Sequence, residues 1–177
     1  MKTTKVLFYC TKGKPYLCRN YDGEFKLSNK PPVLDSLNGR IVAECEVETE
    51  IIVSFCTPTL NTKELLEKSC LTKEQLSEYL NNKCGYALHI KNLILADKPR
   101  ILRDCFVCFI DENIHAPQNM MRIESFWSNE KGILISIRPE WLCKILNGEK
   151  TIEVRKQVLK VMLYDYYSEN GKLKYFK

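Results

Sequence analysis

Within the segment from Ile41 to Ile52, every second residue from position 44 to position 50 is a glutamate, and the positions between them are mostly apolar. One face would carry Ala43, Cys45 and Val47, and the other would carry Glu44, Glu46, Glu48 and Glu50. Successive side chains of a strand point to opposite faces, so a repeat of two positions is the pattern of a strand. We therefore predict a half-buried strand whose outer face is acidic.

Shorter apolar segments predict further strands, several of them next to turn signals such as Lys12-Gly13 and Asp22-Gly23. The predicted strands are Lys5–Cys10, Tyr16–Arg19, Phe25–Leu27, Gly85–Leu95, Ile133–Ile137, Thr151–Lys156, Leu159–Tyr164 and Leu173–Phe176. Within Gly85–Leu95, Tyr86, Leu88 and Ile90 are expected to face away from Ala87, His89 and Lys91. Residues 29–38 and 96–130 show little periodicity and are predicted to be loops, the second with short elements.

Two regions predict helices. Residues 62–81 divide into Thr62–Lys68 and Lys73–Leu80, and the second piece is preceded by the capping-box pair Thr72 and Gln75. A later helix is predicted to begin at Pro139, because proline fits the first helical position, and to end at Asn147-Gly148. Its apolar face would carry Trp141, Leu142, Ile145 and Leu146.

Eight or nine short strands and a few short helices indicate an α+β fold, a small β-barrel with short helices on its rim. The 177 residues suffice for one domain with a sizeable core. No apolar run approaches the roughly 18 residues of a membrane span. The run Val6–Cys10 is too short for the core of a signal peptide. We expect a cytoplasmic protein without membrane contact.

The net charge of +5 is unevenly distributed along the chain. Residues 1–130 contain 17 basic and 17 acidic side chains, whereas residues 131–177 contain ten basic and five acidic ones. Residues 1–20 carry five basic side chains and no acidic one. If the two basic ends meet in space, they form one positive surface of the kind that binds a polyanion. A solvated surface without a ligand is the alternative.

The nine cysteines are an odd set, mostly beside apolar neighbours, and buried thiols are the expected state. Cys105 and Cys108 form the one close pair, with His115 seven residues further on. A structural zinc site needs a second pair at comparable spacing. We therefore expect neither a metal nor a cofactor.

Residues 132–156 carry the most specific motif in the chain. They begin Gly-Ile-Leu-Ile-Ser-Ile-Arg-Pro-Glu-Trp, and Gly148, Lys150, Glu153 and Arg155 fit the pattern G-x-K-x-x-E-x-R. This stretch resembles the opening of ASCH domains, a family of the PUA-like superfamily. The resemblance covers a strand, a helix, its glycine cap and a returning charged strand in that order. It implies a small PUA-like β-barrel with a basic cleft.

Residues 1–127 resemble the same family, but its later portion. The similar segments are Lys5–Lys12, Leu37–Glu44, Leu65–Leu80, Tyr86–Ile90, Asp97–Pro99 and Ala116–Asn119. A single ASCH/PUA-like domain would then span residues 1–177, with its opening segment displaced to 132–177. We favour a circular permutant that closes its own barrel. The alternatives are a homodimer that exchanges this segment, or a gene remnant in which a truncated second copy trails the first.

The resemblance implies that RNA or a nucleotide binds in a cleft lined by Lys150, Glu153 and Arg155. The two cations would contact phosphates or bases, and Glu153 would pair with Arg155 or accept a base amino group. Further candidates for nucleic-acid contact are Arg138, Lys12 and Tyr9, and additional stacking candidates are Tyr16 and Trp127. An ion pair between Glu153 and Arg155 that only holds the strand is the structural alternative.

Some small bacterial ASCH-like proteins are amidohydrolases that remove acyl groups from the N4 position of cytidine with a lysine, a threonine and a glutamate. The resemblance places Lys150 at the lysine and Glu153 at the threonine position, and Glu67 is the nearest candidate for the glutamate. Without the hydroxyl nucleophile, Glu153 would have to act as a base on water, a role that the nearby Arg155 opposes. A nucleoside amidohydrolase is therefore the second hypothesis, and a rearranged member with a purely structural charged strand is the third.

Overall fold

The computed structural model of the chain describes residues 3–32, 36–52, 62–81, 83–102, 115–124 and 131–158. The chain is a mixed α+β protein and divides into two compact units. Unit 1 contains Met1–Thr4, Glu46–Lys91 and Thr151–Lys177, and unit 2 contains Lys5–Cys45 and Asn92–Lys150. Strands β4 (Arg40–Ile52) and β5 (Gly85–Ile101) each contribute residues to both units.

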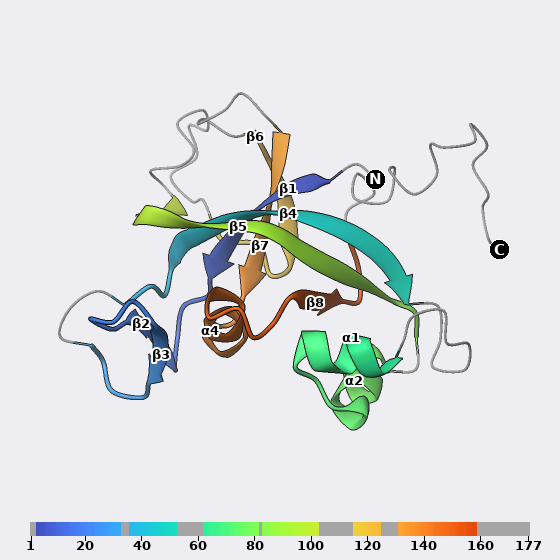
Figure 1. The fold of residues 1–177 in the computed structure, drawn as a ribbon. Coiled ribbons are helices and arrows are strands. Elements are labelled where there is room, and N and C mark those ends of the chain that lie inside the picture. The colour runs from blue at the N-terminus through green and yellow to red at the C-terminus, as the bar shows by residue number, and fades with distance from the viewer. Residues whose placement is uncertain are drawn as a thin grey trace. The chain divides into compact units, whose positions relative to one another are not determined.

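The sheet of unit 2 is built around a parallel pair of strands. Its strand order is β6-β7-β1-β4-β5, with β1 spanning Thr4–Cys10, β6 Met120–Glu124 and β7 Lys131–Ile137. β1 runs parallel to β7 from the pair Val6 and Ile133 to the pair Cys10 and Ile137, and β6 is antiparallel to β7. Figure 1 shows the arrowheads of β1 and β7 pointing the same way. The two strands therefore end at the same edge of the sheet.

Helix α4 (Pro139–Leu146) follows β7 and packs against an antiparallel hairpin of β2 (Tyr16–Arg19) and β3 (Phe25–Ser28). The side chain of Asn147, just after α4, accepts a hydrogen bond from the amide of Phe25 at 3.0 Å and donates one to its carbonyl at 2.9 Å. The Cys143 thiol donates to the same carbonyl at 3.3 Å. One side-chain amide thus fixes the end of α4 to the hairpin.

The core of unit 2 is apolar on both faces of its central strands. Residues 6–10 of β1 are all buried, as are Ile133, Leu134, Ile135 and Ile137 of β7. One cluster of buried side chains consists of Leu7, Tyr9, Ile41, Leu102, Ile123 and Leu134. The parallel pair is therefore enclosed, as parallel strands usually are.

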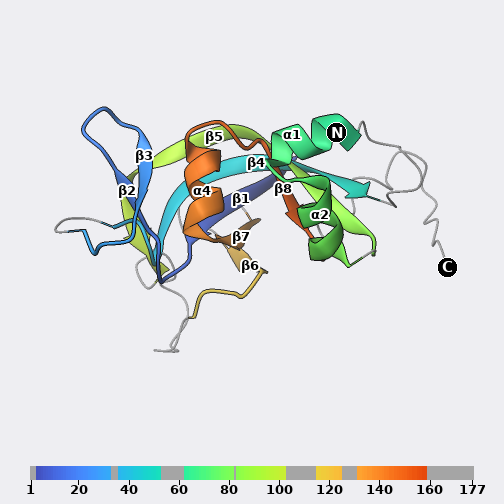
Figure 2. The same ribbon diagram turned by 90° about the horizontal axis from the view of Figure 1, so that it is seen from below.

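Unit 1 packs two short helices against a small set of strands. Helices α1 (Thr62–Ser69) and α2 (Lys73–Leu80) lie near β8 (Ile152–Arg155), which runs antiparallel to β5 (Figure 2). Its core consists of Ile52, Leu65, Leu76, Leu80, Ala87, Ile152 and Val154. The predicted capping box is present: Thr72 accepts from the Gln75 amide, and the Gln75 side chain accepts from the Thr72 amide.

Most predicted elements are confirmed with small shifts of their bounds, including the acidic alternation of β4, in which Ala43, Cys45 and Val47 are buried. The prediction of a loop from residue 96 is wrong in part, because β5 continues to Ile101, whereas β6 at Met120–Glu124 is a short element of the kind expected in this region. The expected alternation in β5 is also incomplete, since Ala87 and Leu88 are both buried and each face of the strand is covered there. The predicted strands at 159–164 and 173–176 lie outside the described residues.

Candidate nucleic-acid interface

Helix α4 presents a basic and aromatic face opposite its apolar one. Arg138 is the N-cap residue, and Pro139 occupies the first helical position, where its missing N–H costs no hydrogen bond. The buried face consists of Pro139, Leu142, Cys143, Ile145 and Leu146. Arg138, Trp141 and Lys144 follow at intervals of three residues, which places them along one side of the helix. Arg138 is exposed, and the other two are half-buried.

The chain after α4 folds back and brings Lys150 to this face. Gly148 has φ +77°, a left-handed conformation that glycine adopts without strain at the end of a helix. The amides of Glu149 and Lys150 then both donate to the Lys144 carbonyl, at 2.9 and 3.1 Å. These two bonds terminate α4 and set the direction of the Lys150 side chain.

The ring of Trp141 lies close to two ammonium groups. The Lys150 Nζ is 5.0 Å from the ring centroid and the Lys144 Nζ is 5.3 Å from it, both within the range of cation–π attraction. Lys150 is only 3% exposed, whereas Trp141 remains half-buried. We call Arg138, Trp141, Lys144 and Lys150 the α4 ridge. All four residues belong to unit 2.

Lys12 and Arg138, both predicted contacts, lie at the shared end of β1 and β7. The Thr11 amide donates to the Ile137 carbonyl at 3.0 Å, so the residues that follow each strand are adjacent in the backbone. Lys12 and Arg138 are both exposed. The parallel register thus brings together two residues that are 126 positions apart in the sequence.

Tyr9 does not lie on the surface. Its side chain is 3% exposed and packs in the core with Leu7 and Ile41, and burial raises the pKa of its hydroxyl above the ordinary value. The phenol oxygen lies near Gly39, since a Cβ added to that glycine would be 3.8 Å from it. In this conformation Tyr9 supports the end of β1 from within the core and offers no ring face for stacking.

Glu153 and Arg155 belong to unit 1, where they form a buried ion pair on β8. Ile152 and Val154 point into the core of that unit, so Glu153 and Arg155 occupy the opposite face of the strand. The Arg155 Nε lies 3.0 Å from the Glu153 Oε1, and the two residues are 9% and 8% exposed. Their cross-strand neighbours on β5 are Tyr86 and Leu88. This geometry matches the predicted ion pair; whether the pair also touches a ligand stays a prediction.

Glu67, the carboxylate named for the hydrolase hypothesis, lies exposed on α1. The same end of α1 is joined to the segment before β8, because the Thr151 amide donates to the Lys68 carbonyl at 2.9 Å. Glu153 already engages Arg155, so its carboxylate is held by a cation. Neither carboxylate shows the setting of a general base poised over a substrate.

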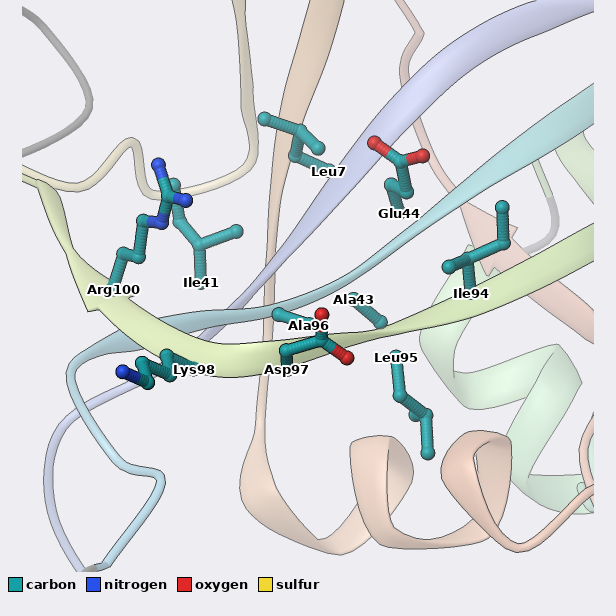
Figure 3. Close-up of a pocket in the computed structure, with 10 residues that line it drawn as sticks. All are labelled: Leu7, Ile41, Ala43, Glu44, Ile94, Leu95, Ala96, Asp97, Lys98 and Arg100. Atoms are coloured by element: carbon teal, nitrogen blue, oxygen red, sulfur yellow. The ribbon is translucent and has the colours of Figure 1, made fainter. Parts of the chain in front are cut away.

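A separate pocket of about 410 Å³ opens on the sheet of unit 2 (Figure 3). Leu7, Ile41 and Ala43 supply apolar surface, and the 57% exposed Ile94 extends it. Its charged residues are Glu44, Asp97, Lys98 and Arg100. Glu44 also lies 4.0 Å from the Lys5 ammonium. Two cations and two carboxylates leave the pocket without a preference for anionic or cationic ligands.

Trp141 is the site residue that the sequence analysis missed. The pattern of the helix assigned it to the apolar face, yet its neighbours at i−3 and i+3 are Arg138 and Lys144. Basic residues three positions before and after Trp141 indicate that part of its ring borders the polar side of the helix. Of the stacking candidates that were predicted, Tyr16 is half-buried on β2 and Trp127 lies outside the described residues.

Comparisons with known protein families, with curated proteins and with solved structures found no match. Within the described ranges, no group of three or more histidine, cysteine, aspartate or glutamate side chains is arranged to hold a metal ion, and Cys105 and Cys108 lie outside these ranges. The described helices include none with the length and apolar character needed to span a membrane.

Proposed function

We propose that this protein binds RNA or a nucleotide through the α4 ridge, and that it is a PUA-like protein of the ASCH kind. The observation that carries the binding proposal is the half-buried Trp141 ring with the ammonium groups of Lys144 and Lys150 beside it. Aromatic rings stack on bases, and nearby cations contact phosphates. The ridge combines both within one helix and its cap.

The electrostatics of the helix account for Lys144 without any ligand, but they do not account for Trp141. Cations are favoured near the carboxyl end of a helix, so Lys144 in the last turn stabilises α4 in any case. Trp141 lies in the first turn, and its half-buried ring keeps an accessible part on which a base could stack. A base stacked on this ring would place its phosphate within reach of the flanking cations.

The order of elements around the signature supports the family assignment. The motif residues run through β7, α4, Gly148 and β8, which is the strand, helix, glycine cap and returning strand that the resemblance implies. β1, which belongs to the segment Lys5–Lys12 that resembles the family's later portion, pairs with β7 of the same chain. This pairing agrees with the permutant explanation. A segment-exchanged homodimer is tested by the solution mass, which would lie well above 20.7 kDa.

Fluorescence anisotropy with a labelled single-stranded oligoribonucleotide tests the binding proposal. Trp141→Leu keeps an apolar side chain but removes the stacking ring, and we expect it to weaken binding by about tenfold, the lower part of the range for one stacked base. Lys144→Ala is expected to weaken binding less and to reduce its salt dependence. Lys30→Ala, which removes an exposed lysine of unit 2 that is not part of the α4 ridge, is the matched control and should change neither.

Two outcomes would overturn the proposal. One is an affinity in Trp141→Leu equal to that of the wild type, and the other is a wild-type protein that binds no RNA or nucleotide at low salt. Release of cytidine from N4-acetylcytidine, lost in Lys150→Ala, would instead establish the amidohydrolase. Because Lys150 is buried, its variant is interpreted only if circular dichroism shows an unchanged fold.

A further inference from the structure

The loop between β1 and β2 carries two lysines at the edge where β1 and β7 end. Lys12 and Lys14 are both exposed, and Gly13 between them has φ +103°. A non-glycine residue rarely adopts that backbone conformation, so the glycine permits a tight reversal that presents both lysines. The loop therefore has a defined shape rather than an arbitrary one.

Asn38 holds this loop in place from a different part of the chain. Its side-chain nitrogen donates to the carbonyl of Gly13 and, at 3.0 Å, to that of Pro15. Its side-chain oxygen accepts from the Leu17 amide at 2.8 Å and from the Ser36 hydroxyl at 3.1 Å. One amide side chain thus fixes both the tip of the loop and the start of β2.

The backbone next to Asn38 also orients Lys12. The Gly39 amide donates to the Cys10 carbonyl at 2.8 Å, which joins this segment to the end of β1. A Cβ at Gly39 would lie 3.3 Å from the Cγ and 3.4 Å from the Cε of Lys12, so the lysine stem runs along the glycine. Packing of the stem leaves fewer conformations for the ammonium group to lose on binding.

The charges of this edge are predominantly positive. Lys12, Lys14 and Arg138 make no ion pair with any residue in the described ranges. A carboxylate near this edge is Glu140 in the first turn of α4, which adds to the effect of burial in raising the pKa of the Cys10 thiol. Three cations against one carboxylate favour an anionic ligand.

We propose that the Lys12–Lys14 loop is a preformed phosphate-binding loop that extends the α4 ridge, so that the partner is a single-stranded polynucleotide rather than a mononucleotide. This inference rests on the proposed function. Arg138 and Lys144 are six positions apart, a rise of about 9 Å along α4, and the Lys12–Lys14 loop adds two further exposed cations at the Arg138 end, so the cations form an extended row. A polynucleotide backbone supplies phosphates at both ends.

The salt dependence of binding tests the loop directly. Each phosphate contact to a single strand contributes about 0.7 to the slope of log K against log salt concentration. We expect Lys12→Ala/Lys14→Ala to lower the slope for a single-stranded oligoribonucleotide by about 1.4 and to leave the affinity for a nucleoside monophosphate unchanged. Lys26→Ala/Lys30→Ala, which removes two exposed lysines from the β3 region, should leave the slope as in the wild type.

A double-mutant cycle tests the role of Asn38 as a positioning residue. Asn38→Ala is expected to weaken oligoribonucleotide binding in the wild-type background and to have no further effect when both lysines are already absent. Hydrogen exchange at the Leu17 amide, which loses its acceptor, shows whether the loop has been released. An equal effect of Asn38→Ala in both backgrounds would show that it acts on the fold and would overturn its positioning role.

The two proposals fail in different ways. Loss of binding in Trp141→Leu with an unchanged salt slope in Lys12→Ala/Lys14→Ala would leave the function standing and remove the phosphate loop. A wild-type protein that binds no nucleic acid would remove both. Equal loss of monophosphate and oligoribonucleotide affinity in the double-lysine variant would show a mononucleotide site and contradict the polynucleotide assignment.

Discussion

The charged residues of β8 in unit 1 and those of the α4 ridge in unit 2 come from one short motif but have different environments. Glu153 and Arg155 neutralise each other on a buried strand face, whereas Arg138 is exposed and Lys144 half-buried beside an aromatic ring. Buried charges need partners, and exposed charges remain available to a ligand. Burial therefore separates the Glu153–Arg155 pair from Arg138 and Lys144, whereas Lys150 of the ridge is itself buried and lies against the Trp141 ring.

The largest expected effect comes from breaking the buried pair. Glu153→Ala removes the carboxylate that lies 3.0 Å from the Nε of the buried Arg155, and we expect a loss of about 3 kcal/mol in the free energy of unfolding. Lys144→Ala on the α4 ridge should change it by less than about 0.5 kcal/mol, as surface substitutions usually do. Urea unfolding followed by circular dichroism measures both.

A variant that removes both charges sharpens this first contrast. Glu153→Leu/Arg155→Met should recover most of the loss, because replacing a whole buried pair by apolar residues is often neutral. If Glu153→Ala and Lys144→Ala lowered stability equally, burial would not distinguish the two sets of charges, and the contrast would not hold.

The next effect concerns the attachment of α4 to its hairpin. Asn147→Ala removes both hydrogen bonds to the Phe25 backbone, and we expect a loss of about 1–2 kcal/mol. The melting temperature of the protein measures it, with Asn29→Ala in an exposed loop as the control. A melting temperature equal to that of the control would show that α4 does not depend on this contact.

A smaller effect is expected in unit 1, at the start of α2. Thr72→Ala removes the side-chain acceptor of the capping box and should cost about 1 kcal/mol, whereas Thr72→Ser keeps the hydroxyl and most of the stability. Hydrogen exchange at the Gln75 amide reports the loss locally. Equal exchange in the two variants would contradict the role of the cap.

The smallest effect on stability at neutral pH concerns Cys10, which we expect to differ from Cys84 in its reactivity. Burial, and secondly the Glu140 carboxylate, raise the pKa of the Cys10 thiol to about 12, whereas Cys84 is exposed. In the folded protein Cys10 should resist alkylation by iodoacetamide at pH 8 while Cys84 reacts, which peptide mass spectrometry measures. Because the pKa of the Cys10 thiol is higher in the folded protein than in the unfolded chain, the protonated thiol contributes to the free energy of unfolding. That contribution is complete below pH 9, the ordinary pKa, and is lost as the pH rises from 9 to 12. Alkylation of Cys10 at the same rate as Cys84 would contradict its burial.

Local patterns predicted most of the elements because their signals lie within a few residues. The alternation of β4, the capping box at Thr72 and the glycine after α4 need no information from distant residues. The extension of β5 to Ile101 escaped prediction because Pro99 and two neighbouring charged residues are typical of a loop. A strand that tolerates them here is held by its neighbour β4.

The candidate site was less predictable because it depends on which strands pair. Tyr9 is a candidate nucleic-acid contact by resemblance, but residues 6–10 of β1 are buried on both faces, so alternation gives no sign of an exposed side. Lys12 and Arg138 meet only because β1 and β7 run parallel, a pairing between segments far apart in sequence. The hydrogen bonds of Asn38 at the same edge also follow from no local pattern, because Gly13, Pro15 and Leu17 lie 21 to 25 positions away in the sequence.

The parallel pairing also has a consequence for synthesis on the ribosome. Val6 lies opposite Ile133, so β1 cannot gain this partner until 127 further residues have been made. At typical elongation rates of about 5–20 residues per second, that interval is on the order of ten seconds. During this time one edge of a strongly apolar strand remains open, which is the feature that promotes association between unfinished chains. A chaperone that binds extended apolar segments would therefore have its natural target at residues 6–10.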